Sequence, residues 1–301
     1  MTPARPPIVV GIDGSDTALA ALDFALTEGS NRGLPVHVVH AWSVPIPPVP
    51  LGGASVSTSN DEALRDVAQQ LLDEALAHAT KFASDVEVSG ELRTSAPATA
   101  LLTASHDAHM AVVGSRGHSA VGEVLLGSVS LQVAMHARCP VVVVHATPAG
   151  SAPGPEAGRV VVGVDGSPLS AAALREAFRE ASLRRTGLTV VHAWTGLAGF
   201  DVPGGEVHWE QLARDSEDEE LRMMAEQLAG LREEFPDVAV QQRLIQGRPA
   251  HEIADASRGA ELVVVGSRGR GGFVSLLLGS VSHGVLHRAH CPVMVVRESA
   301  R

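Results

Sequence analysis

Short runs of apolar residues alternate along this chain with longer stretches in which apolar residues recur every three or four positions. Ile8 to Ile12 is the first apolar run, and Leu19, Leu22 and Leu26 follow it on one face of a predicted helix. A short apolar run is typical of a buried parallel strand, whereas the three-and-four spacing is typical of an amphipathic helix. The chain therefore opens with a strand that leads into a helix.

The same alternation continues to the end of the first half. Further strands are predicted at Val36 to Trp42, near Val86 to Leu92, at Met110 to Gly114 and at Val141 to His145. The long helix after the second strand has an apolar face made of Leu64, Val67, Leu71, Leu72, Ala75, Leu76 and Ala79. Pro97 suits the first turn of the next helix, and Ser128 begins a fourth. Strands that alternate with helices predict a parallel sheet covered on both faces.

This whole pattern occurs twice, with a constant offset. Asp165 lies 152 positions after Asp13, and Gly266 lies 152 positions after Gly114. The strands of the second copy are predicted at Val160 to Val164, Leu188 to Trp194, Val238 to Ile245, Leu262 to Gly266 and Val293 to Val296. Ala171, Leu174 and Phe178 form the apolar face of its first helix, and Pro249 begins its third helix. A repeat of this length is a complete domain, so we expect domains at 1–147 and 159–301 joined by a linker at 148–158.

Each domain is predicted to be α/β, with five parallel strands in the order 3-2-1-4-5 and helices on both faces. This is the flavodoxin-like or adenine-nucleotide-hydrolase-like doubly wound fold. Ligands of such sheets bind at the switch point, which here lies between strands 1 and 4. Asp13 ends strand 1, and Gly114 to Gly117 ends strand 4, so we expect both to face one crevice.

The residues at this crevice are suited to phosphates. Gly114 and Gly117 permit positive φ angles and a close approach of the backbone, which can form an anion-binding nest. The helix that starts after Gly127 directs free N–H groups at the same place, and Arg116, Ser128 and Ser130 add side-chain donors. Asp13 suits ribose hydroxyls or a divalent ion that bridges phosphates.

Composition narrows the classes of function. The net charge of −11 gives no footprint for nucleic acid, and Lys81 is the single lysine, so a Walker-type phosphate loop is excluded. No apolar run is long enough to cross a membrane and the first residues do not resemble a signal peptide, so we expect a cytoplasmic protein. Cys139 and Cys291 precede apolar strands and are expected to be buried thiols, and no metal-ligand spacing is present.

The motif Gly-x-x-Gly-(nine residues)-Gly-Ser, together with the aspartate of strand 1, resembles the ATP-binding branch of the universal stress protein family. The likeness covers nearly all of the chain, as a tandem member. It implies ATP with Mg²⁺ in each domain, with the aspartate region near adenosine, a strand-2 alanine backbone at the adenine edge and the glycine motif around the phosphates. The first site comprises Gly11, Ile12, Asp13, Ala41, Gly114, Arg116, Gly117, Gly127, Ser128, Val129 and Ser130. The second comprises Gly163, Val164, Asp165, Ala193, Gly266, Arg268, Gly269, Gly279, Ser280, Val281 and Ser282.

Three functions remain open at this point. The first is a stress-response protein that binds ATP and acts as a sensor or regulator, the second is a slow ATP hydrolase, and the third is a scaffold with vestigial sites. Hydrolysis needs a base, and His40 and His192 are more readily interpreted as structural residues at strand ends. Because the fifth strands are apolar and lie at a sheet edge, we expect the two domains to pair through them as an internal pseudo-dimer, and further assembly to a homodimer.

Overall fold

The computed structural model of the 301-residue chain describes residues 5–43, 59–117, 126–145, 154–194, 209–270 and 277–297, and of residues 59–61 and 209–216 it describes the backbone alone. The proline-rich loop expected at Pro45 to Gly53 and most of the expected linker lie outside these ranges. The chain divides into two compact units, Met1–Val144 and His145–Arg301. Each unit is described here by itself.

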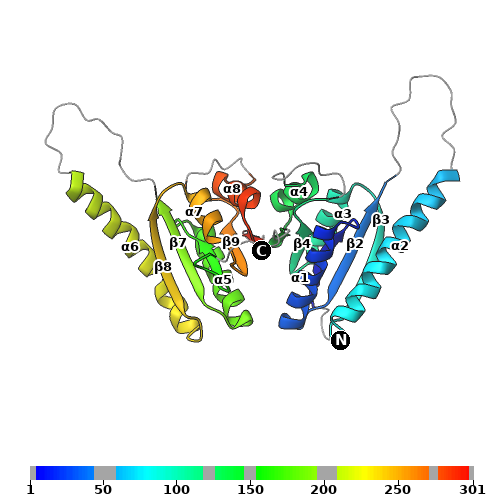
Figure 1. Cartoon of the computed structure of the whole chain (residues 1–301), viewed down its shortest axis with the longest axis horizontal. Helices are drawn as coiled ribbons and strands as arrows, with labels where there is room; N and C mark the ends of the chain where they lie inside the picture. The colour runs from blue at the N-terminus through cyan, green and yellow to red at the C-terminus, as the bar shows by residue number, and fades with distance from the viewer. Residues whose placement is uncertain are drawn as a thin grey trace, which may run out of the picture. The chain divides into compact units, whose positions relative to one another are not determined.

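Both units alternate strands and helices (Figure 1). The first unit contains β1 (Ile8–Ile12), α1 (Asp16–Arg32), β2 (Val36–Trp42), α2 (Ser59–Phe82), β3 (Val88–Thr94), α3 (Pro97–Ala104), the 3₁₀ turn η1 (Ser105–Asp107), β4 (Met110–Gly114), α4 (Ser128–His136) and β5 (Val141–Val144). The second contains β6 (Val160–Gly163), α5 (Pro168–Arg184), β7 (Leu188–Trp194), α6 (Trp209–Glu234), β8 (Val240–Gln246), α7 (Pro249–Ala256), β9 (Leu262–Gly266), α8 (Ser280–Arg288) and β10 (Val293–Val296).

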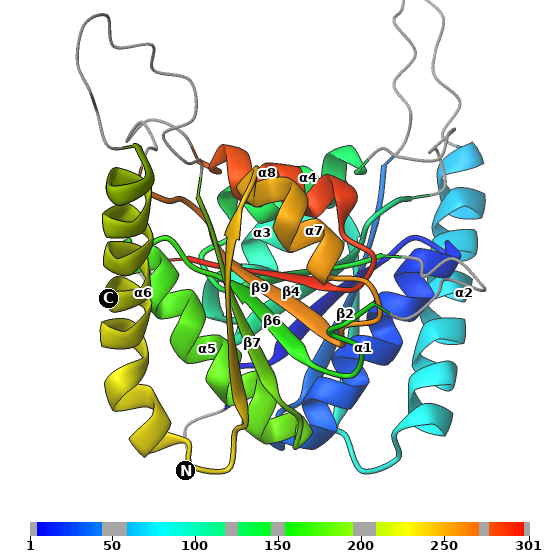
Figure 2. The same cartoon turned by 60° about the vertical axis from the view of Figure 1, so that its left-hand side comes forward.

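The sheet of each unit has the predicted topology. The strands of the first unit lie in the order β3-β2-β1-β4-β5, and those of the second in the order β8-β7-β6-β9-β10, all of them parallel within a unit. In the first unit α1 and α2 pack together on one face, and α3 and α4 on the other (Figures 1 and 2). The prediction of a doubly wound sheet in the order 3-2-1-4-5 is therefore confirmed.

The core of each unit lies between the sheet and its helices. Strand β4 is buried from Met110 to Val113, and strand β9 is buried throughout. From the helices, Leu22 and Leu26 of α1 and their counterparts Leu174 and Phe178 of α5 are at most 1% exposed. Burying side chains of this size contributes about 1.5–3 kcal/mol each, which fixes both helices on the sheet.

Parts of the predicted apolar faces are wrong. Leu19 and Ala171 are exposed, whereas their neighbours Ala18 and Ser170, in the first turns of α1 and α5, are buried. Leu64 and Val67 of α2 are also exposed, since the packed part of that helix starts at Ala68. A three-and-four spacing marks a stripe on a helix, but it does not tell how far along the helix the sheet extends.

Several predicted strand ends shift by one or two residues. β3 begins at Val88 and β8 at Val240, each two residues later than expected. The valines Val86 and Val238 lie in the preceding turns, where their N–H groups donate to Ala83 O and Phe235 O. β5 ends at Val144, one residue before His145, and β6 ends at Gly163, one residue before Val164; the other strands match their predicted bounds.

Candidate functional site

The first element of the site is an aspartate held by the turn after the first strand of each unit. Oδ1 of Asp13 accepts hydrogen bonds from the backbone N–H of Ser15 at 3.0 Å and from its hydroxyl at 2.6 Å. Oδ1 of Asp165 accepts from the N–H of Ser167 at 3.0 Å. The turns pass through Gly14 and Gly166, whose φ angles of 81° and 79° favour glycine. The local chain therefore fixes each carboxylate at the end of its strand.

Asp165 also bonds to the loop that follows β9. Its Oδ2 accepts a hydrogen bond from the backbone N–H of Arg270 at 2.8 Å, which joins two segments that are 105 residues apart. Burial acts to raise the pKa of the Asp165 carboxyl, but the hydrogen bonds from Ser167 and Arg270 outweigh burial and hold this pKa below its usual value. The side chain is therefore an anion and an acceptor at neutral pH.

The glycines at the end of β4 and β9 allow close packing, although not in the expected way. None of Gly114, Gly117, Gly266 and Gly269 has a positive φ, so the expectation of a nest built on positive φ angles is wrong. At Gly114 a Cβ atom would come within 2.7 Å of the carbonyl carbon of Thr17, at the start of α1. Gly114 therefore lets strand β4 pack closely against a helix of the same unit, and a close approach to a ligand stays a prediction.

Gly117 and Gly269 make room for the aspartates. A Cβ atom on Gly117 would lie 2.5 Å from Oδ2 of Asp13, and one on Gly269 would overlap Oδ2 of Asp165. Real Cβ atoms do not come this close to a carboxylate oxygen, so a side chain at either position displaces the aspartate. The glycine motif and the strand-1 aspartate are thus one packed arrangement in each unit.

The last part of the motif closes the loop and begins a helix. The N–H of Gly127 donates to Ser115 O, and the N–H of Gly279 donates to Ser267 O, both at 2.7 Å. The hydroxyls of Ser130 and Ser282 donate to Gly114 O and Gly266 O at 2.6 Å. These two buried hydroxyls were expected to face a ligand. Their protons are directed at the strand ends, so only their oxygens, as acceptors, are left for a ligand, and their contact with one stays a prediction.

The N-termini of α4 and α8 remain suited to an anion. No side chain caps either helix, so the described residues provide no acceptor for the N–H groups of the first turn, which start at Ser128 and Ser280. Such groups, with the positive end of the helix dipole, attract anions. Ser128 and Ser280 are exposed, so their hydroxyls stay at the surface beside these N–H groups.

In the second unit these parts surround a cavity of about 400 Å³. All eleven residues proposed for the second site line it: Gly163, Val164, Asp165, Ala193, Gly266, Arg268, Gly269, Gly279, Ser280, Val281 and Ser282. The structure adds lining residues that were not predicted as part of the site, namely Ser170, Pro249, Ile253, Val265 and Arg270. Ser170 and Ile253 come from helices α5 and α7, outside the glycine motif and the strand ends from which the site was predicted.

In the first unit the corresponding residues hold the same relations. Gly11, Ile12 and Ala41 lie at the ends of β1 and β2, and Ile12 pairs with His40 across these two parallel strands. Arg116 is half-buried, and its carbonyl accepts a hydrogen bond from the hydroxyl of Thr17 at 2.5 Å. Val129 lies between the exposed Ser128 and the buried Ser130 in the first turn of α4.

The two histidines at the strand ends make structural contacts. Nδ1 of His40 lies 2.8 Å from Ile12 O, and Nδ1 of His192 lies 2.7 Å from Val164 O. A carbonyl oxygen only accepts, so Nδ1 carries the hydrogen in both rings. Both side chains are buried, and each fixes the strand end that leads to the aspartate. This agrees with the structural interpretation of these histidines.

Other chemistry is limited in the parts of the chain that the structure describes. No group of three or more His, Cys, Asp and Glu side chains in these ranges is arranged to hold a metal ion. No helix among the described residues has the length and apolarity that crossing a membrane requires. Cys139 and Cys291 are buried thiols, as expected, and burial raises the pKa of the Cys291 thiol to about 12, so this thiol stays protonated.

Comparison with known proteins gives a consistent result. The model of the universal stress protein family matches residues 5–145 and again residues 156–297. The chain is 40% identical to Universal stress protein Rv2005c of Mycobacterium tuberculosis over 297 residues, which cover 97% of each chain. It is 37% identical to Universal stress protein Rv2623 of the same organism over 303 residues, covering 97% of this chain and 96% of that protein. A universal stress protein from Archaeoglobus fulgidus has the same fold, with a TM-score of 0.69, 20% identity and coverage of 98% and 97%.

Proposed function

This chain belongs to the universal stress protein family, and we propose that each of its two units binds one ATP molecule. In this proposal the protein acts in the cytoplasm as a nucleotide-dependent sensor or regulator of a stress response. The observation that carries the proposal is the cavity of about 400 Å³ in the second unit. It is lined by the carboxylate of Asp165 and by the N-terminus of α8, which no side chain caps. A nucleoside phosphate has ribose hydroxyls that can donate to the carboxylate and anionic phosphate oxygens that suit the helix N-terminus.

The adenosine part would lie on the side of the aspartates. The carboxylate of Asp165 accepts from the N–H groups of Ser167 and Arg270, and its oxygens have further lone pairs with which they can accept from a ribose hydroxyl. Ala193, at the end of β7, lines the same cavity, and its backbone would read the adenine edge. Ala41 takes this role in the first unit, beside Asp13.

The phosphates would lie against the glycine motif. The first-turn N–H groups of α4 and α8 and the side chains of Arg116 and Arg268 are the donors for phosphate oxygens. Mg²⁺ fits as a partner of the phosphates rather than as a resident ion, because the described residues offer no three-ligand group. Asp13 or Asp165 would be the protein's contribution to its shell.

Binding rather than turnover is the function that these residues favour. A hydrolase needs a base that orients and deprotonates water. The aspartates are engaged by hydrogen bonds at the strand turns, and Nδ1 of His40 and of His192 donates to a carbonyl. We therefore expect at most weak ATPase activity.

The direct test is chemical. The purified full-length protein is denatured, and the supernatant is analysed for adenine nucleotides by chromatography and mass spectrometry. Isothermal titration of the nucleotide-free protein should give two ATP per chain, and one per chain after Gly117→Val or Gly269→Val. No nucleotide in either experiment would exclude the proposal, and measurable phosphate release during titration would favour the hydrolase.

A further inference from the structure

We propose that Arg270 is a phosphate-binding side chain of the second unit, and that it pairs with Glu220 until a nucleotide phosphate takes the place of this carboxylate. This inference rests on the proposed function, and it concerns how the second site distinguishes a nucleotide from a nucleoside without phosphates. It makes the two sites of the chain unequal. It rests on the contacts of Arg270 with Asp165 and with Glu220.

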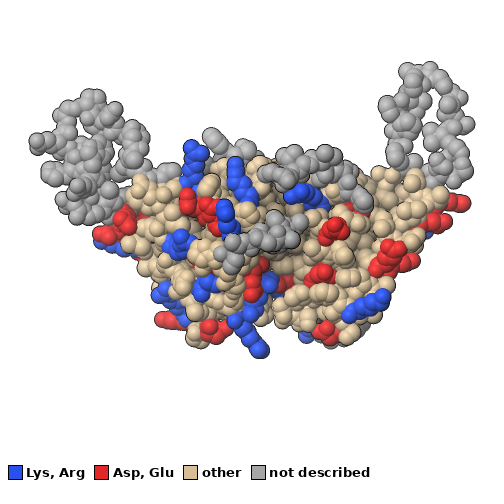
Figure 3. Space-filling view, in the orientation of Figure 1, with Lys and Arg blue, Asp and Glu red and all other residues tan. Residues whose placement is uncertain are grey.

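Arg270 is placed over the cavity by its backbone and by a glycine. Its N–H donates to Oδ2 of Asp165 at 2.8 Å, and the residue lines the cavity together with Arg268. Its guanidinium lies directly over Gly166, where a Cβ atom would overlap Nη2. The side chain therefore reaches from the loop after β9 to the turn after β6. In Figure 3 Lys and Arg side chains gather on the second unit at the end that carries α7 and α8.

Glu220 of α6 is the counter-charge. Its Oε2 lies 4.0 Å from Nη1 of Arg270 and 2.9 Å from Nε2 of His192, which makes no well-directed hydrogen bond with it. The Glu220 side chain is 22% exposed, and that of Arg270 is 53% exposed. Attraction between partly exposed charges at this distance is weak, so the guanidinium can leave Glu220 at little cost. Glu220 then still faces His192.

A phosphate group is a better partner for Arg270 than this carboxylate. The guanidinium presents a planar fork of N–H donors that matches two phosphate oxygens, and such charge-assisted bonds are stronger than a 4.0 Å ion pair. The exchange couples occupancy of the cavity to α6, because it removes one contact between that helix and the site. Adenosine has no phosphate and leaves the pair intact.

The first unit does not have this pair. Ala68 of α2 is the counterpart of Glu220, at the same offset of 152 positions, and it is buried. The counterpart of Arg270 is His118, which lies outside the described residues. An alanine cannot form an ion pair, so the first unit has no counterpart of the contact between Arg270 and Glu220. We therefore infer that the second site distinguishes ATP from adenosine more strongly than the first.

The experiment uses the full-length chain with the first site disabled by Gly117→Val, titrated separately with ATP and with adenosine. In this background Arg270→Ala should weaken ATP binding about tenfold, the effect of losing a charge-assisted contact, and leave adenosine within about twofold. Glu220→Gln should strengthen ATP binding about two- to fivefold, since it removes the competing carboxylate, and leave adenosine unchanged.

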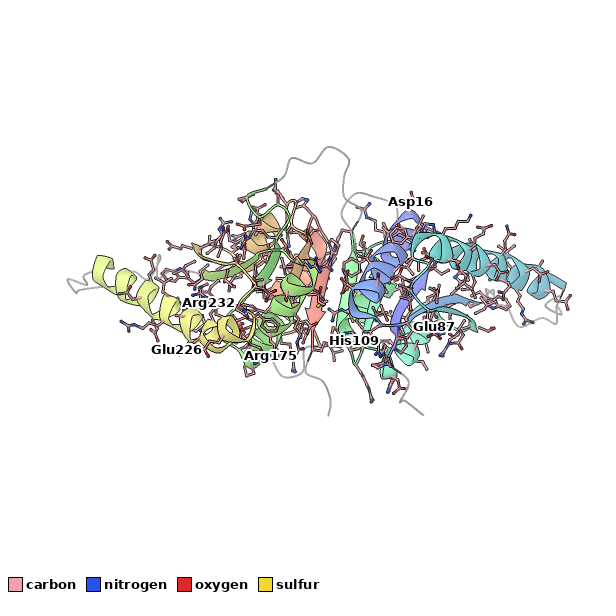
Figure 4. The ribbon with its side chains drawn as sticks, turned by 90° about the horizontal axis from the view of Figure 1, so that it is seen from below. Asp16, Glu87, His109, Arg175, Glu226 and Arg232 are labelled. Carbon is pink, nitrogen blue, oxygen red and sulfur yellow. The ribbon has the colours of Figure 1, made fainter. Side chains whose placement is uncertain are left out.

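The matched control is Arg175→Ala. Arg175 of α5 (Figure 4) also pairs with a carboxylate of α6, Glu234, at 2.5 Å, and its side chain is 48% exposed, close to the 53% of Arg270, but it does not line the cavity. This variant removes the same charge and should leave both affinities within about twofold. An equal loss of ATP and adenosine binding in Arg270→Ala would overturn the inference, because it indicates a structural role for Arg270.

Two further outcomes also decide the question. An Arg270→Ala chain that binds ATP as tightly as its parent, or a Glu220→Gln chain that binds ATP more weakly, overturns the inference and leaves the proposed function intact. A parent chain that binds neither ATP nor adenosine overturns the proposed function itself, and this inference with it.

Discussion

At the scale of single residues, the site depends on where a side chain is missing. The hydrogen of Gly117 faces the carboxylate of Asp13, whereas Gly127 has open contacts, with no atom closer than 3.4 Å to a Cβ placed on it. Both glycines belong to one motif, yet only the first is needed to avoid a clash inside the site. Alanine substitutions separate these two roles.

We expect Gly117→Ala to lower the free energy of unfolding of the nucleotide-free protein by about 1–3 kcal/mol, because its Cβ atom displaces the Asp13 carboxylate. Gly127→Ala is the matched control, since its φ of −63° suits any residue, and it should stay within about 0.5 kcal/mol of the parent. Urea unfolding followed by circular dichroism measures both. Equal destabilisation by the two variants would contradict the packing role given to Gly117.

The lowered pKa of Asp165 predicts how the second unit responds to acid. A carboxyl whose pKa is lower in the folded state adds stability above its unfolded pKa of about 3.9, and this stability is lost as the pH falls through the lower folded value. Asp165→Asn should therefore be less stable than the parent at pH 7, and the difference should shrink below about pH 4. Urea midpoints at pH 7, 5 and 3 test this, and a constant difference would contradict it.

At the same scale, the sequence predicted which residues gather at the site better than it predicted what they do. The spacing placed Asp165 and Gly269 together, but positive φ angles were assigned to glycines that instead relieve a clash. The hydroxyls of Ser130 and Ser282 were assigned to a ligand, although they bond to backbone carbonyls. A motif fixes residue types, whereas the choice between two acceptors is made by packing that the sequence alone does not contain.

At the scale of elements, strand positions followed the hydrophobic pattern where strands are buried on both faces. β4 and β9 match their predicted bounds because every residue from Met110 to Val113 and from Leu262 to Gly266 is buried. β3 and β8 are edge strands with several exposed residues, so the hydrophobic pattern predicted their first and last residues less accurately. The order of strands was predictable because short crossovers leave few topologies.

Helices α1 and α5 both carry a buried ion pair that the hydrophobic pattern does not reveal. Glu180 is fully buried and accepts from Arg184 Nε at 3.2 Å, and Glu28 pairs with Arg32 in the same way at 2.9 Å. A charge so deeply buried is stable only while its partner is present. The last turn of each helix is thus held by an electrostatic contact within the core.

We expect Arg184→Met to lower the free energy of unfolding by about 3–5 kcal/mol, because it leaves the Glu180 carboxylate buried without this partner. The double variant Glu180→Leu with Arg184→Met should recover most of the loss, since no charge is then buried. Arg179→Met is the control on the same helix, as Arg179 is half exposed and pairs with Glu176 near the surface, and it should change stability by less than about 0.5 kcal/mol. A loss in the control as large as in Arg184→Met would contradict this explanation.

At the scale of the whole molecule, the open question is how the last strand of each unit is covered. β5 pairs with β4 and β10 pairs with β9, and each is the final strand in the order of its own unit. Their sequences, Val141 to Val144 and Val293 to Val296, are entirely apolar. An apolar edge with unpaired backbone groups invites pairing with another strand. We propose that these two edges cover each other as an internal pseudo-dimer, and that whole chains associate further to a homodimer.

Expression of residues 1–150 alone tests the pairing. This fragment keeps β1 to β5 but lacks β10, so the edge of β5 has no partner within its own chain. If the two edges pair in the full-length protein, the fragment should satisfy its edge with a second copy and sediment as a dimer, or aggregate. A parent fragment that sediments as a stable monomer at micromolar concentration would mean that β5 needs no partner strand, and the internal pseudo-dimer would then be wrong.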